Sequence, residues 1–169
     1  MQGKILFILL SCILLSAAVA TPASQQSADI KPLEPIVKGD RILILAPHPD
    51  DEVLGCAGVI QEAVKAGAQV HVAFLTNGEH NELAFIVFKK SIILRQKDFI
   101  NLGEVRHSES EKSAKLLGLK ESDLTFLGYP DFGSFTIFSR YWQTDKPYNT
   151  ILTRISKVPY KNNLSFYEL

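Results

Sequence analysis

The chain has 169 residues, of which 46% are hydrophobic and 21% are charged, so it is long enough for one domain with its own core. Its 18 basic and 18 acidic residues cancel, and the whole chain therefore lacks the positive charge that is typical of nucleic-acid-binding proteins. The small basic clusters at 89–90 and 95–97 have no aromatic residues interleaved for base stacking. We therefore expect no nucleic-acid partner.

Residues 1–20 have the pattern of a signal peptide. Lys4 supplies a positive charge, residues 5–15 are almost all apolar, and 18–20 (Ala-Val-Ala) fits a cleavage site between small residues. The apolar stretch is shorter than the roughly 20 residues that a membrane span needs. We therefore predict a secreted or periplasmic protein with no stable membrane span. An uncleaved N-terminal membrane anchor is the alternative, and attachment as a lipoprotein through Cys12 fits less well because the apolar run continues past it.

Residues 21–39 are polar and rich in proline, which predicts a linker between the cleavage site and a domain over 40–169. Cys56 would be the one cysteine left after cleavage. We therefore expect no internal disulfide, and a domain stabilised by packing.

The first part of the domain predicts a strand, a helix and a second strand. Residues 41–46 form a short apolar run, typical of a strand buried on both faces of a parallel sheet. Residues 52–66 have apolar side chains at helical spacing, and Gly67 can end that helix. Residues 69–75 predict the second strand. Such a unit predicts a parallel crossover.

The second part of the domain continues the alternation. We predict a helix over 83–103, a clearer amphipathic helix over 104–117, a third strand over 124–127, and weak helical character near 148–157. Alternating strands and helices predict an α/β class, Rossmann-like and of three layers (α/β/α), with a mostly parallel sheet that is incomplete at its C-terminal end.

The candidate metal-binding and catalytic residues lie in the segment 46–52, between the first predicted strand and the first predicted helix. In open α/β sheets, ligands bind at the carboxyl ends of the strands. His48 and Asp51 are one helical turn apart, so both can point at a single metal ion, whereas Asp50 must point elsewhere. Acids in a first helical turn also complement the helix dipole. From the residues alone, a metal site and a helix-capping role stay open.

Two further polar loops follow the second and third strands, over 76–81 and 128–131. The carboxyl ends of parallel strands share one edge of the sheet, so these loops and the 46–52 segment should converge on one pocket. Asn77 and His80 in the first loop are candidate substrate contacts, and Asp131 lies in the second loop.

Here the sequence resembles the PIG-L/LmbE family of zinc-dependent de-N-acetylases. The resemblance rests on the motif His-Pro-Asp-Asp-Glu within residues 46–58, on Thr-Asn-Gly-Glu at 76–79, on Arg106 with Glu109 in a helix, and on Gly-Tyr-Pro-Asp at 128–131. It extends from about 40 to 133, and more faintly to 162.

By this resemblance the chain is a metal-dependent amidohydrolase that removes an N-acetyl group from an N-acetylglucosamine-type glycoconjugate. His48 and Asp51 would be ligands of Zn²⁺, or of another divalent metal, and Asp50 would be the general base for a zinc-bound water. Arg106 and Asp131 would contact substrate or order the site.

The third zinc ligand of the resembled family is a histidine well downstream, in a motif that this chain does not contain before Leu169. Of the remaining histidines, His71 is expected within a strand and His107 on a solvated helix surface, which leaves His80 as the internal substitute. We expect instead that the sequence is a fragment or a truncated gene product.

Three other functions compete with this interpretation. A nucleotide-binding domain would need a glycine-rich loop where acidic residues stand after the first strand, and a serine hydrolase would need a Gly-x-Ser-x-Gly motif that the sequence lacks. The serious rival is a non-catalytic remnant with a partial metal-binding or carbohydrate-binding site.

Overall fold

The computed structural model describes residues 31–81, 95–151, 153–160 and 163. Contacts divide the chain into two units, 1–34 and 35–169, and the fold described here is that of the second. The predicted signal peptide and most of the predicted linker lie outside the described residues, as does the first part of the helix predicted over 83–103.

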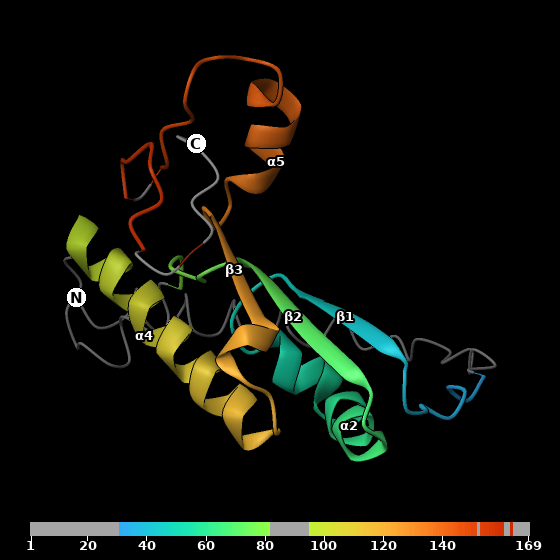
Figure 1. The fold of residues 1–169 in the computed structure, drawn as a ribbon. Helices are drawn as coiled ribbons and strands as arrows, with labels where there is room; N and C mark the ends of the chain where they lie inside the picture. The colour runs from blue at the N-terminus through green and yellow to red at the C-terminus, as the bar shows by residue number, and fades with distance from the viewer. Residues whose placement is uncertain (1–30, 82–94, 152, 161–162, 164–169) are drawn as a thin grey trace, which may run out of the picture. The chain divides into compact units, whose positions relative to one another are not determined.

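The second unit is built on a parallel sheet of three strands (Figure 1). The strands are β1 (Arg41–Ala46), β2 (Gln69–Thr76) and β3 (Leu124–Tyr129), in the order β1-β2-β3. β2 pairs with both neighbours in parallel. The predicted strands and the predicted α/β class with a parallel sheet are therefore confirmed.

Helix α2 (Asp51–Ala66) connects β1 to β2. Its apolar face places Ile60 and Ala63 in the core, where both are fully buried. Gly67 follows with a φ of 75°, a left-handed conformation that glycine adopts without strain. The helix and its predicted end are confirmed.

Helix α4 (Gln96–Leu116) connects β2 to β3 and is one continuous helix where the sequence predicted two. It begins after Arg95, whose backbone N–H donates to the Asp98 carboxylate at 3.0 Å. It ends before Gly118, which has a φ of 90° and continues the chain in a left-handed turn. The predicted boundary near 103–104 is wrong because Gly103 and Glu104 continue the helical hydrogen bonding.

The core lies between one face of the sheet and the two helices. It contains Ile44, Ala46, Val70, Val72, Phe74 and Phe126 from the strands, and Ile60, Ala63, Ala114 and Leu119 from the helices and the turn after α4. The alternate β1 residues Leu43 and Leu45 are each 62% exposed. The prediction that this strand is buried on both faces is therefore wrong for the described part of the chain.

The last part of the described chain is mostly irregular. A short 3-10 turn (η1, Glu121–Asp123) precedes β3, and a helical segment follows it, made of α5 (Ser134–Thr136) and the π-helical η2 (Ile137–Tyr141). The weak helix predicted near 148–157 is not found among the described residues of that range.

Gly55 and Gly58 lie on the exposed side of α2. A Cβ atom added at either position would meet nothing within 4 Å. Both face away from the core, so close packing does not explain them.

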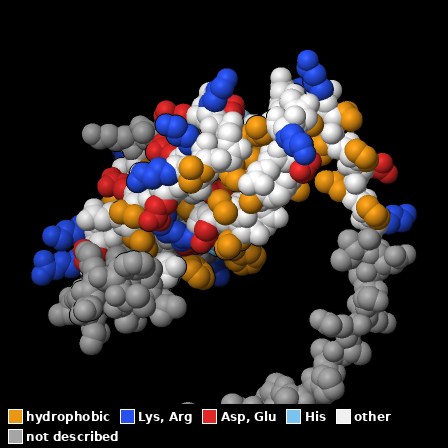
Figure 2. All heavy atoms as spheres, turned by 90° about the horizontal axis from the view of Figure 1, so that it is seen from below, with side chains coloured by type: hydrophobic (Ala, Val, Ile, Leu, Met, Phe, Trp, Pro, Cys, Tyr) orange, Lys and Arg blue, Asp and Glu red, His pale blue; other side chains and the backbone are white. Residues whose placement is uncertain are grey.

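The surface carries both signs of charge. Figure 2 shows acidic and basic side chains intermixed on the face seen from below, with apolar groups between them. This pattern agrees with the formal net charge of zero. Within the described part of the chain, none of the helices is both long enough and apolar enough to cross a membrane.

Candidate active site

The loops after β1 and β2 are joined by hydrogen bonds at the carboxyl edge of the sheet. The Thr76 backbone N–H and its hydroxyl both donate to the Pro47 carbonyl oxygen, at 3.1 and 2.9 Å. The Thr76 hydroxyl in turn accepts from the Gly78 N–H at 3.1 Å. One threonine therefore ties the turn after β2 to the His-Pro-Asp-Asp-Glu loop.

His48 lies between two carboxylates that come from different loops. Its Nδ1 atom is 3.3 Å from Asp51 Oδ2, and its Nε2 atom is 3.1 Å from Asp131 Oδ1. The side chain of Asp131 is 7% exposed, whereas those of His48 and Asp51 are 43% and 41% exposed. The imidazole is thus fixed on its buried side and accessible on the side of Asp51.

Asp50 has an unusual backbone conformation, with a φ of 115° and a ψ of −28°. Residues with side chains rarely adopt such a φ, and it persists only where the surroundings impose it. Its carboxylate is 57% exposed and forms an ion pair with Arg106, in which Nη2 lies 3.0 Å from Oδ2. The Asp50 carboxylate therefore points towards Arg106 on α4 and does not take part in the contact between His48 and Asp51.

Arg106 connects the loops after β1 and β2 to α4 through hydrogen bonds. Its Nη1 donates to the Gly78 carbonyl at 2.9 Å, and its Nη2 donates to the Pro49 carbonyl as well as to Asp50. A Cβ at position 78, where φ is 62°, would lie 2.1 Å from Nη1 of Arg106. Gly78 is thus required for this arginine to reach the loop. Of the two roles expected for Arg106, its contacts favour ordering the site.

The acids at the start of α2 do not serve as simple helix caps. Asp50 stands at the N-cap position, yet its side chain makes no capping hydrogen bond. Asp51 Oδ2 accepts from the His48 N–H at 2.9 Å, which lies outside the helix. The capping role left open by the sequence is therefore not what these two side chains do.

The donor set of His48 and Asp51 fits a divalent metal. Two ligands that each lie about 2.0–2.1 Å from a tetrahedral zinc ion are separated by about 3.3 Å, which is the distance between His48 Nδ1 and Asp51 Oδ2. Asp131 at the other ring nitrogen matches the carboxylate that commonly orients a metal-bound histidine. The pair therefore fits two positions of a zinc site.

A third ligand is not supplied by the described residues. No group of three His, Cys, Asp or Glu side chains in that part of the chain is arranged to hold a metal ion. His80, the internal substitute suggested by the sequence, places its backbone N–H 3.2 Å from Asp131 Oδ2 and its ring against Phe132, with centroids 4.4 Å apart. It is therefore brought to the site through Asp131 and not as a member of a ligand triad.

Asn77 takes a different position from the one expected. Its residue is fully buried, and its Oδ1 accepts from Asn163 Nδ2 at 2.7 Å. The contact with Asn163 supports the loop after β2, while Nδ2 of Asn77 is buried without a hydrogen-bond partner among the described residues. The substrate contact expected for Asn77 stays a prediction.

Glu79 is a further residue of this edge, and no role was predicted for it. It is 7% exposed, and its Oε1 accepts from the Asp131 N–H at 3.0 Å. Burial raises the pKa of Glu79 above its ordinary value, and this effect exceeds the opposing effect of the hydrogen bond from Asp131. The motif Thr-Asn-Gly-Glu contained this residue, so a signal for it was present in the sequence.

The other two histidines lie away from this edge. His71 is in β2, as predicted, and its Nε2 is 2.8 Å from Thr125 Oγ1. His107 stacks on Phe126 with centroids 3.6 Å apart, and its side chain is only 12% exposed. The prediction of a solvated His107 is wrong, because this face of α4 packs on β3.

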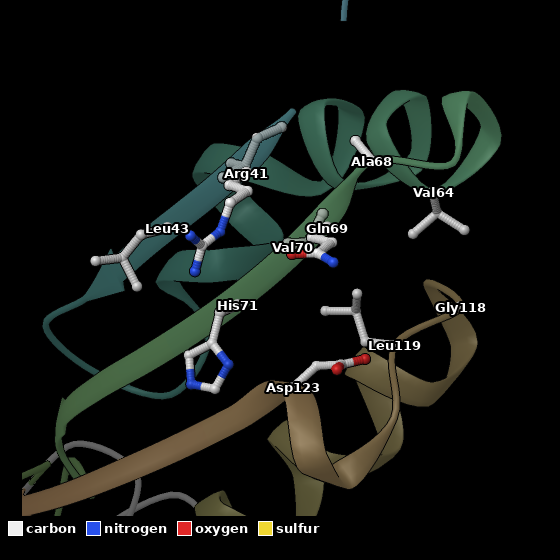
Figure 3. Close-up of a pocket in the computed structure, with 11 residues that line it drawn as sticks. Arg41, Leu43, Val64, Ala68, Gln69, Val70, His71, Gly118, Leu119 and Asp123 are labelled. Atoms are coloured by element: carbon white, nitrogen blue, oxygen red, sulfur yellow. The ribbon is translucent and has the colours of Figure 1, made fainter. Parts of the chain in front are cut away.

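A cavity of about 730 Å³ lies at the opposite ends of the strands. It is lined by Arg41 and Gln69, the first residues of β1 and β2, and by His71, Leu119 and Asp123 among others (Figure 3). It is separate from the convergence of the three loops.

Comparison with known proteins identifies the family of the chain. The sequence model of a family described as "PIG-L: GlcNAc-PI de-N-acetylase" matches residues 43–160, a range that contains all three loops. The chain belongs to the PIG-L family. The resemblance inferred from the His-Pro-Asp-Asp-Glu motif is thereby confirmed.

Relatives of this PIG-L chain include named deacetylases. A diacetylchitobiose deacetylase of Thermococcus kodakarensis is 30% identical over 93 residues, which is 55% of this chain and 31% of that protein. The chain therefore spans about a third of the length of this curated relative.

Solved structures give similar matches. An N,N'-diacetylchitobiose deacetylase from Pyrococcus horikoshii, in complex with an inhibitor, is 27% identical with a TM-score of 0.44, and the match covers 63% of this chain and 39% of that one. The conserved protein TT1542 from Thermus thermophilus is 32% identical with a TM-score of 0.37, over 54% and 33% of the two chains.

Proposed function

We propose that this PIG-L chain takes part in the zinc-dependent hydrolysis of an N-acetyl group from an N-acetylglucosamine-type sugar. The observation that carries the proposal is the placement of His48 between Asp51 and Asp131, next to Asp50, at the carboxyl edge of the sheet. Membership of the PIG-L family and the named deacetylase relatives support the same reaction class.

His48 and Asp51 would hold the metal through Nδ1 and Oδ2. When bound there, zinc would lower the pKa of a water molecule and polarise the amide carbonyl. Asp131 Oδ1 accepts a hydrogen bond from the Nε2–H of His48, which orients the ring and would leave the lone pair of Nδ1 available to hold a metal.

Asp50 is proposed as the general base. Its carboxylate is more than half exposed, so it can reach a water molecule, and Arg106 limits the directions in which it can point. In the reaction Asp50 accepts a proton from the attacking water while the water oxygen bonds to the amide carbonyl carbon. The C–N bond then breaks, the nitrogen takes up a proton and leaves as the amine of the sugar, and the acyl group leaves as acetate. The group that protonates the leaving amine is not assigned to any described residue.

The test is the zinc content and the deacetylase activity of the full chain. Zinc is measured by atomic absorption after dialysis, and amine release is followed with N-acetylglucosamine and with diacetylchitobiose. We expect about one zinc per chain, lost in His48→Ala and kept in a His71→Gln control, because His71 lies in β2 with Thr125 as its partner.

The Asp50→Asn variant distinguishes loss of the general base from loss of the metal. It should keep the zinc and lower the rate of amine release by about 10²- to 10⁴-fold, the usual contribution of a general base. If the full chain binds no stoichiometric zinc and releases no amine, this chain is not a deacetylase by itself. That result would support the alternative predicted from the sequence, a non-catalytic chain with a partial metal-binding or carbohydrate-binding site.

A further inference from the structure

Glu52, the last residue of the His-Pro-Asp-Asp-Glu motif, is a buried acid to which the proposed reaction gives no role. The residue is 1% exposed, and it is among the largest fully buried side chains of the described chain. Burying a carboxylate is unfavourable unless hydrogen bonds replace its water. The hydrogen bonds of its two carboxylate oxygens therefore indicate its role in the fold.

The carboxylate of Glu52 bridges the start of α2 and the last turn of α4. Its Oε2 accepts from the Asp50 backbone N–H at 2.9 Å. Its Oε1 lies 3.2 Å from the Ser113 hydroxyl, which shares its one proton between Glu52 and the Ser110 carbonyl oxygen at 3.0 Å. Ser113 and Arg106 both belong to α4. The backbone and the carboxylate of Asp50 are thus held by two separate groups that are anchored on the same helix.

The Asp50 conformation explains why its N–H needs a partner. At a φ of 115° the residue is outside the range that side-chain-bearing residues prefer. Rotation back to a negative φ would turn both the N–H and the Cα–Cβ bond, and so would re-aim the carboxylate. The bond to Glu52 is broken by such a rotation, and the bond therefore opposes it.

We propose that Glu52 is a positioning residue that holds the Asp50 backbone in its left-handed conformation and so sets the direction of the Asp50 carboxylate. The effect on catalysis rests on the proposed role of Asp50 as general base. The effect on the Asp50 backbone does not, and it can be measured in the absence of metal and substrate.

The first experiment measures hydrogen exchange at the Asp50 amide by NMR in the full chain. Glu52→Met keeps the length of the side chain and removes both hydrogen bonds, whereas Glu52→Gln keeps an oxygen that can accept from Asp50. Glu62→Met is the matched control, because Glu62 lies on the same helix and its side chain is 69% exposed. We expect exchange at Asp50 to accelerate about tenfold in Glu52→Met, and to stay close to the wild-type rate in Glu52→Gln and in the control.

The second experiment measures kcat and KM with N-acetylglucosamine substrates in the same variants. A displaced base should lower kcat about 10- to 100-fold with little change in KM, and Glu52→Gln should recover most of the loss. A chain that only lost stability would show a lower melting temperature with unchanged kcat per folded molecule. That result would overturn the catalytic part of the proposal.

A third variant keeps the test decisive if Glu52→Met does not fold. Ser113→Ala leaves the acid in place but removes its anchor on α4, and it should accelerate Asp50 exchange to a smaller extent. Asp50 exchange equal to that of the Glu62→Met control in every folded variant would overturn the proposal. If the wild-type chain has no deacetylase activity, the proposed function fails, and the exchange rates alone decide the role of Glu52.

Discussion

His48 Nε2 and Asp131 Oδ1 lie 3.1 Å apart, although 83 positions separate the two residues in the sequence. The contact exists because β1 and β3 both end at the same edge of the parallel sheet, on either side of β2. Asp131 is nearly buried and also accepts from the His80 N–H at 3.2 Å. Its carboxylate is therefore fixed, and it can fix the imidazole in turn.

Asp131→Asn should weaken zinc binding at His48. An amide can still contact Nε2, but it lacks the negative charge that raises the basicity of the ligating nitrogen. Loss of such an orienting carboxylate commonly weakens metal affinity by about 10- to 100-fold. Zinc affinity is measured by competition with a chromophoric chelator at fixed pH. The control is Asp145→Asn, an exposed acid in the loop after η2. Equal affinities of the two variants would show that Asp131 does not orient the ligand.

Gly78→Ala should disrupt the contact between the turn after β2 and Arg106. The added Cβ would lie 2.1 Å from Nη1 of Arg106, and the residue would keep a left-handed φ of 62°. We expect the free energy of unfolding to fall by about 1–3 kcal/mol, measured by urea denaturation.

Gly55→Ala is the opposite case and serves as the control for Gly78→Ala. It lies in α2, where a Cβ would meet nothing within 4 Å. Alanine favours a helix over glycine by about 1 kcal/mol, so this variant should be more stable than the wild type. Equal destabilisation by both substitutions would show that contact with Arg106 is not the reason for Gly78.

Much of this fold and part of the site could be predicted from sequence because the signals are local. The apolar run of β1, the helical spacing that ends at Gly67, and the acids after Pro49 each depend on neighbouring residues. Parallel topology then implied that the three loops share one edge. That the loops carrying His48 and Asp131 converge followed from that reasoning, whereas the direct contact between the two side chains did not.

The failures concern contacts between distant residues. Asn77 stands in a polar loop like a surface residue, yet it is fully buried and accepts a hydrogen bond from Asn163. His107 occupies a helix position next to a charged residue, yet it stacks on Phe126 of β3. Leu43 was expected to be buried, but it is exposed, because burial of the second face of the sheet requires elements elsewhere in the chain to cover it. None of these contacts is encoded in the spacing of nearby residues.

Tyr160→Phe should stabilise the fold. The Tyr160 hydroxyl is buried, and among the described residues it has no hydrogen-bond partner. It also lies so close to α4 that a Cβ on Gly103 would meet it at 2.1 Å. A buried polar group without a partner costs about 1–3 kcal/mol, so its removal should raise the free energy of unfolding measured in urea. A loss of stability instead would indicate that a bound water satisfies the hydroxyl.

Glu79→Gln should change how stability depends on pH. Burial raises the pKa of Glu79 above its ordinary value of 4.5 in the folded chain. Below that value the acid is protonated in both states, and its contribution to stability is fully present. As the pH rises above 4.5, the unfolded chain releases the proton before the folded chain does, so the folded state loses stability until the raised pKa has been passed.

Glutamine does not titrate and keeps an oxygen that can accept from the Asp131 N–H. The stability of Glu79→Gln relative to wild type should therefore grow between pH 4.5 and neutral pH and be smallest below 4.5. Melting temperatures of both proteins across this range, with a chelator present so that metal release makes no contribution, provide the measurement. A difference that is constant with pH would mean that Glu79 titrates alike in the folded and unfolded chain, and that its burial is relieved by solvent entering the site.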